Sequence, residues 1–189
     1  MPSPLRRWRE GRRRRRLAWR LYRRAVVQAR RPEFYTLCRV PDTIEGRFEL
    51  VTLHVLLLWR WLQRRPRPES ALAQAVVDAF FTDLDRNLRE MGVGDLSVGK
   101  HVKRIAGSFL ARTRDLQAAL DTGDAAAVTA ILARNLEDGG HPPADAAALA
   151  RYALAQDAAL AAATAADPAT ASVPFVPPRF ATTRDEPRH

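Results

Sequence analysis

Apolar side chains recur along this chain at the three- and four-residue spacing of a helix, and no segment sustains the alternation typical of a strand. The pattern is strongest over residues 44–63, where most positions are apolar and the few polar side chains form one narrow stripe. A helix that is apolar nearly all round is buried at the centre of a domain or forms the wall of a groove. We therefore expect this segment to be the central helix of the fold.

Further segments with helical spacing flank it, separated by the prolines, glycines and polar turns that end or begin helices. The last of them is rich in alanine, and a proline-rich tail follows. The pattern predicts an all-α, bundle-like domain of six or seven helices over residues 17–166, and a tail over 167–189 that is extended or disordered. The expected helices cover residues 17–30, 44–63, 70–90, 97–120, 124–137 and 144–166.

Positive charge is concentrated at the N-terminus. Residues 1–31 carry thirteen arginines and one glutamate, a net charge of +12, whereas residues 32–189 carry −2. Because dense like charges repel, residues 1–16 are expected to be a disordered arm, either simply solvated or bound to ribosomal RNA or an anionic membrane face. Because residues 32–189 are close to neutral, we expect no specific binding of DNA. The expected contacts to an anionic surface are Arg12, Arg13, Arg14, Arg15 and Arg16.

Composition and spacing argue against several functional classes. A single cysteine precludes an internal disulfide framework and a cysteine-only metal cage, and the uncharged run over residues 50–59 is half of a membrane span. The four histidines lack the i, i+4 spacing of a helical metal site, and no Cys–His pair or glycine-rich loop has the context that catalysis requires. We therefore expect no enzyme activity, no metal and no cofactor.

Polar residues cluster at the start of the apolar helix and at the turn near residue 92. They are either helix caps and surface ion pairs, or the rim of a groove that holds an apolar helix of a client. In the first interpretation His54 is a histidine of the hydrophobic core, and in the second interpretation it lines the groove. The candidate binding residues are Asp42, Arg47, Glu49, Val51, His54, Val55, Leu58, Arg89, Glu90, Asp95, Lys100 and Lys103.

Two stretches carry a specific resemblance. The first includes Phe34-Tyr35, the run VPDTIEGRFEL at residues 40–50, and Leu53-His54; the second is NLREMGVGDLSV at residues 87–98, extended by Lys100 and Lys103. Together they resemble the ubiquinol-cytochrome c chaperone family, over about residues 18–136.

The resemblance implies an all-helical assembly factor for the cytochrome bc1 complex that binds newly made cytochrome b and needs no cofactor. Members in mitochondria work with a small partner protein and associate with the ribosome. The alternative function is a ribosome- or nucleic-acid-binding adaptor that acts through the basic arm. No apolar segment follows the arginines, so no export signal is expected. The expected location is the bacterial cytoplasm with peripheral attachment to the inner membrane, or else the matrix side of the mitochondrial inner membrane.

Overall fold

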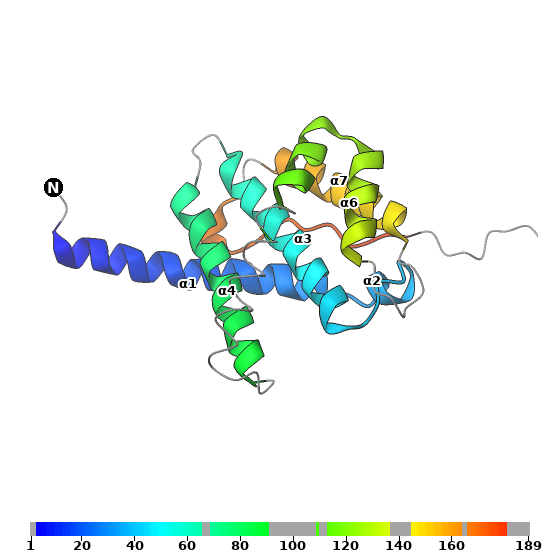
Figure 1. Ribbon diagram of the computed structural model, residues 1–189. Coiled ribbons are helices and arrows are strands. Elements are labelled where there is room, and N and C mark those ends of the chain that lie inside the picture. The colour runs from blue at the N-terminus through cyan, green and yellow to red at the C-terminus, as the bar shows by residue number, and fades with distance from the viewer. Residues whose placement is uncertain are drawn as a thin grey trace, which may run out of the picture.

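All regular secondary structure in the described part of the chain is helical, which confirms the all-α fold class. The computed structural model describes residues 3–65, 69–90, 109, 113–136, 145–163 and 166–180. The labelled helices are α1 (Pro4–Ala29), α2 (Glu33–Thr36), α3 (Ile44–Gln63), α4 (Ser70–Glu90), α6 (Ala125–Leu136), α7 (Ala146–Ala162) and the 3-10 helix η1 (Pro168–Thr170) (Figure 1). Residues 113–122 form a further helical segment.

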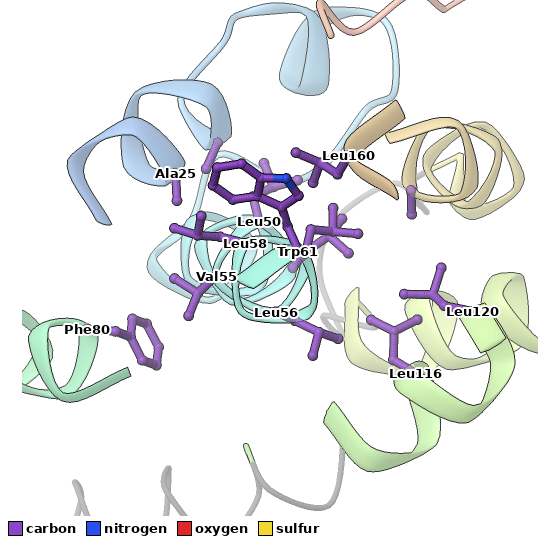
Figure 2. Close-up of a cluster of buried hydrophobic side chains, with 14 of the residues drawn as sticks. Ala25, Leu50, Val55, Leu56, Leu58, Trp61, Phe80, Leu116, Leu120 and Leu160 are labelled. Carbon is purple, nitrogen blue, oxygen red and sulfur yellow. The ribbon is translucent and has the colours of Figure 1, made fainter. Parts of the chain in front are cut away.

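Helix α3 is the centre of the bundle, with the bounds that the sequence predicts. It packs against α1, α4, α6 and α7. Figure 2 shows α3 nearly end-on, with Val55 on the side of Phe80 from α4. On another side Leu56 points toward Leu116 and Leu120. Each such buried side chain contributes about 1.5–3 kcal/mol through the apolar surface that it removes from water, so α3 organises the core.

The basic N-terminus differs from the expected disordered arm, because α1 is one helix from Pro4 onward. Its first turn is capped by Ser3, whose side chain accepts a hydrogen bond from the backbone N–H of Arg6, and Arg6 pairs with Glu10 one turn later at 2.9 Å. Arginine has high helix propensity, and the buried second half of α1 supplies a nucleus from which the helix extends. Figure 1 shows this basic half extending beyond the rest of the molecule.

The alanine-rich helix α7 is an integral part of the core. Asp145 caps it by accepting a hydrogen bond from the backbone N–H of Ala148 at 2.8 Å. Its small side chains let it lie close to α6 and α3, where it buries a full face. The buried residues are Ala146, Ala148, Leu149, Ala150, Tyr152, Ala153, Gln156, Asp157 and Leu160.

The described part of the C-terminal tail begins with η1, continues without regular secondary structure and packs on the bundle. After η1, residues 172–180, here called the strap, run without regular secondary structure, with Val173, Phe175 and Phe180 half-buried against the core. The predicted helix over 97–120 and most of the second family-like stretch lie outside the described residues, apart from residues 87–90, 109 and 113–120, all of which are helical. Among the helices of the described segments, none is long and apolar enough to cross a membrane.

Candidate binding site

The turn before α3 holds the first group of candidate residues. Thr43 caps α3 by accepting a hydrogen bond from the backbone N–H of Gly46 at 3.1 Å. Arg47 Nε donates to Asp42 Oδ1 at 2.6 Å, and this bond keeps the pKa of the Asp42 carboxyl below its ordinary value. Both side chains are about 60% exposed (61% and 60%). The geometry therefore supports a turn-fixing role for the pair, on a surface that a partner can reach.

The same turn requires glycine at position 46. A Cβ atom there would collide with the backbone carbonyl of Pro41 and would lie 3.3 Å from Val40 Cγ1. Only glycine lets the extended chain pass this close to the first turn of α3. The family-like run at residues 40–50 thus specifies a close approach of the backbone at Pro41 to the first turn of α3. The cap at Thr43 is part of the same turn.

The interpretation of α3 as a groove that holds a client does not fit three of its candidate residues. His54, Val55 and Leu58 are fully buried, whereas Val51 is half-buried and Glu49 is buried near the helix start. A helix that is apolar nearly all round has to be covered on every side, and α1, α4, α6 and α7 do so here. The interpretation of His54 as a core histidine agrees with its position.

The second group of candidates is described only in part. Arg89 pairs with Asp85 at 2.8 Å and Glu90 pairs with Arg86 at 2.8 Å, both one helical turn apart on the exposed face of α4. Such exposed pairs contribute about 0–1 kcal/mol each. Asp95, Lys100 and Lys103 lie outside the described residues, so their role stays a prediction.

Cys38 is buried in a setting that suppresses its reactivity. Its thiol donates to the carbonyl oxygen of Asp145 at 3.2 Å, and burial raises its pKa to about 12. The thiol therefore stays protonated at neutral pH, whereas a nucleophilic cysteine requires the thiolate. Among the residues that the structure describes, no group of three His, Cys, Asp or Glu side chains is placed to hold a metal ion.

A buried polar network links α1, α3 and α7. His54 Nδ1 lies 2.7 Å from the Leu50 carbonyl oxygen, so this nitrogen carries the hydrogen. His54 Nε2 then accepts a hydrogen bond from the Tyr152 hydroxyl at 2.8 Å, and Gln28 Nε2 donates to that hydroxyl at 3.0 Å. Burial lowers the pKa of His54 to about 4 and raises that of Tyr152, so both side chains are neutral at physiological pH.

The same network holds the strap by its backbone. Gln28 Nε2 donates to the carbonyl oxygen of Val176 at 2.7 Å, and the N–H of Val176 donates to Gln156 Oε1 at 2.9 Å. Two glutamines from different helices thus bind both polar groups of one extended residue, as a neighbouring β-strand does.

Aromatic rings hold the strap on either side of Val176. The ring centroid of Phe175 lies 5.7 Å from that of His54. The Phe180 ring lies 5.7 Å from Phe34 and 6.2 Å from Tyr152. These spacings are those of favourable aromatic pairs. The surface beneath the strap is here called the strap groove and consists of Gln28, Phe34, His54, Tyr152 and Gln156.

Comparison with known proteins decides the family. A sequence profile described as "Ubiquinol-cytochrome C chaperone" matches residues 36–175. The chain belongs to the ubiquinol-cytochrome c chaperone family. The resemblance inferred from the sequence is confirmed, and the match continues past α7 into the strap.

Two relatives agree with this family assignment. The crystal structure of the Cbp3 homolog from Brucella abortus is similar with a TM-score of 0.72 and 35% identity, covering 88% of this chain and 91% of that one. Ubiquinol-cytochrome c reductase complex assembly factor 1 of Mus musculus is 26% identical over 94 residues. That match covers 50% of this chain and 32% of the mouse protein, about a third of its length.

The strap groove of this family member was not predicted from its sequence. Its residues come from α1, α2, α3 and α7, and Gln28 and Val176 are 148 positions apart, so no local spacing brings them together. The available signal was weaker: Gln28 and Gln156 are uncharged polar residues on helix faces that are otherwise apolar. Because buried amides need partners, such residues indicate a tertiary hydrogen-bond network without naming its members.

Proposed function

We propose that this protein is an assembly chaperone for ubiquinol-cytochrome c reductase, the cytochrome bc1 complex, and that its client is newly made cytochrome b. The observation that supports this most is the family match over residues 36–175. The name of the mouse relative, an assembly factor of the same complex, points the same way. Neither the family description nor the relatives' names support the alternative of a nucleic-acid-binding adaptor.

The proposed role needs binding and no reaction. Membrane-protein segments expose apolar surface before insertion, and a partner that covers this surface suppresses aggregation. Within the described part of the chain, Cys38 is a buried, protonated thiol and His54 bonds to Leu50 and Tyr152, so both side chains have structural roles. The proposal therefore assigns the protein no catalytic step.

Deletion of the gene tests the proposal. We expect the cytochrome bc1 complex to be depleted and cytochrome b to be degraded, because an unprotected client aggregates or is proteolysed. Reduced-minus-oxidised haem spectra of membranes measure the complex, and succinate dehydrogenase serves as the unaffected control. Cross-linking in cells that translate cytochrome b should link newly made cytochrome b to the chaperone. Normal bc1 levels in the deletion strain, or no cross-link to cytochrome b, would contradict the proposal.

We further propose that the basic half of α1 attaches the protein to an anionic membrane surface. Near its tip Leu5 and Trp8 are 69% and 55% exposed, and the Arg12 guanidinium lies over the Trp8 ring, 4.8 Å from its centroid. Exposed apolar and aromatic side chains among arginines suit the interface of an anionic bilayer. The proposed contacts, all exposed, are Arg12, Arg13, Arg14, Arg15 and Arg16.

Vesicle flotation tests this attachment. We expect binding to phosphatidylcholine vesicles that contain phosphatidylglycerol, and little binding to phosphatidylcholine alone. Replacement of the five arginines at 12–16 by glutamine should weaken binding at least about tenfold, because each basic residue near anionic lipid contributes about 1 kcal/mol. A control for position, which removes two positive charges instead of five, replaces Arg86 and Arg89 on α4 by glutamine and should bind like wild type. Equal binding to both kinds of vesicle, or binding to ribosomal RNA instead, would contradict membrane attachment.

A further inference from the structure

The strap is held on the bundle by two backbone hydrogen bonds at Val176 and by contacts of its aromatic rings. Of residues 172–180, Pro178 is buried, and the others are half-buried or exposed. Three prolines at 174, 177 and 178 have no backbone N–H to donate. Its clamp to α1 and α7 is centred on one residue, Val176. Segments with few buried contacts open at a lower free energy than the whole domain unfolds, so the strap can leave while the bundle stays folded.

The strap groove recognises backbone and aromatic rings, which are general features of a polypeptide. The bonds from Gln28 and to Gln156 involve the main chain of Val176, so they would form with almost any residue at that place. The rings of Phe175 and Phe180 supply the remaining contacts with Phe34, His54 and Tyr152. An extended segment with two aromatic side chains five residues apart, and an ordinary residue directly after the first, therefore fits the groove.

The groove also holds a donor that the strap leaves unused. Gln156 is fully buried and its Oε1 accepts from Val176, but its Nε2 has no hydrogen-bond partner. An unpaired buried amide donor is unfavourable, because it has lost its hydrogen bonds to water. An occupant that offers an additional acceptor to Gln156 would relieve this cost and bind better than the strap does.

We propose that the strap groove is the client-binding site and that the strap occupies it when no client is present. An extended, aromatic-containing segment of an unfinished polypeptide displaces the strap and takes over the backbone bonds to Gln28 and Gln156. This inference deepens the proposed chaperone function and rests on it for the identity of the client. The strap then prevents the groove from binding unrelated chains. A client has to bind the groove more strongly than the strap does in order to displace it.

A peptide with the strap's own sequence, residues 172–180 carrying a fluorescent label, tests the groove directly. It is added to the full-length chain and to a full-length double variant, Phe175→Ala with Phe180→Ala, whose own strap is weakened. We expect the double variant to bind the peptide at least about tenfold more tightly, measured by fluorescence anisotropy, because the covalently attached strap competes less. Equal binding by the two chains, or no binding by either, would overturn the proposal.

Two matched peptides test the backbone clamp. N-methylation at the position of Val176 removes the N–H that Gln156 accepts, and should weaken binding about tenfold, the effect of one hydrogen bond. N-methylation at the exposed position of Arg179 serves as the control and should have little effect. If both modified peptides bind like the unmodified one, the clamp does not recognise the occupant.

Hydrogen exchange of the unmodified protein tests displacement without a variant. The amide of Val176 should exchange at least about a hundredfold faster than those of α3, because the strap opens by itself. Protection equal to that of α3 would contradict a displaceable strap. None of these measurements uses cytochrome b, so a groove that binds the peptide while the deletion strain keeps normal bc1 levels would refute the proposed function alone.

Discussion

Replacement of Arg60 by leucine is expected to lower the free energy of unfolding by about 3–5 kcal/mol, the effect of breaking a buried ion pair. Arg60 is 1% exposed. Its Nε and Nη2 donate to the two carboxylate oxygens of Asp157 at 2.8 and 3.0 Å, and its Nη1 donates to the Gln117 carbonyl oxygen at 3.2 Å. Leucine fills much of the space but leaves the buried carboxylate of Asp157 with one partner, Arg64. Chemical denaturation monitored by circular dichroism measures the loss.

The matched control is Arg64→Leu, which removes the outer member of the same network. Arg64 donates to Asp157 at 2.7 Å and to Asp121 at 2.6 Å, but more than a third of its side chain is exposed. Solvent screens such a pair, and Arg60 still holds both carboxylates, so we expect a loss of about 1 kcal/mol or less. Equal losses in the two variants would show that burial does not set the strength of the network.

The same network has an expected pH dependence. Burial alone would raise the pKa of Asp157, but hydrogen bonds from Arg60 and Arg64 outweigh it and lower the pKa below the ordinary value of 3.8. A carboxyl whose pKa is lowered by folding stabilises the folded state above its unfolded pKa, and this contribution is lost as pH falls through the folded pKa. The wild-type protein should therefore lose stability below about pH 4 more steeply than Arg60→Leu does.

The local sequence pattern was sufficient to predict helix α3, but it was insufficient to predict which residues of other helices contact α3. Continuous apolarity predicted the bounds of α3 correctly, since this signal lies within the helix itself. Arg60 was predicted only as one member of a polar stripe. Its carboxylate partners, Asp121 and Asp157, are 61 and 97 positions away, and only the packing of the helices brings them together.

Composition left the structure of both chain ends incompletely predicted. Charge repulsion favoured a disordered arm over residues 1–16, and proline content favoured a tail that is extended or disordered. In the structure the arm continues a helix whose second half is buried, and the strap gains partners from α1 and α7. Composition describes a segment in isolation, whereas the basic arm continues from the buried half of α1 and the strap contacts the bundle. The groove along α3 failed as a prediction for the same reason, because elements far apart in sequence cover that helix.

Replacement of Gly46 by alanine is expected to lower the free energy of unfolding by about 2 kcal/mol, within the usual range for overpacking. The added Cβ would meet the backbone carbonyl of Pro41, which is not the end of a flexible side chain. The turn cannot easily move away, since Thr43 caps the helix at Gly46 and Arg47 pairs with Asp42. Relief of the clash therefore has to break the cap or shift α3 within a close-packed core.

Arg47→Ala separates this structural role from a binding role at the same turn. It removes only an exposed ion pair, so its effect on unfolding should be about 0–1 kcal/mol, measured by denaturation beside Gly46→Ala. If the guanidinium of Arg47 contacts the client, bc1 levels in cells should fall in Arg47→Ala while stability is retained. If bc1 levels fall only in Gly46→Ala, the turn serves the fold alone. A Gly46→Ala protein as stable as wild type would show that the close approach of the backbone at Pro41 tolerates a side chain, and that the glycine is not required by packing.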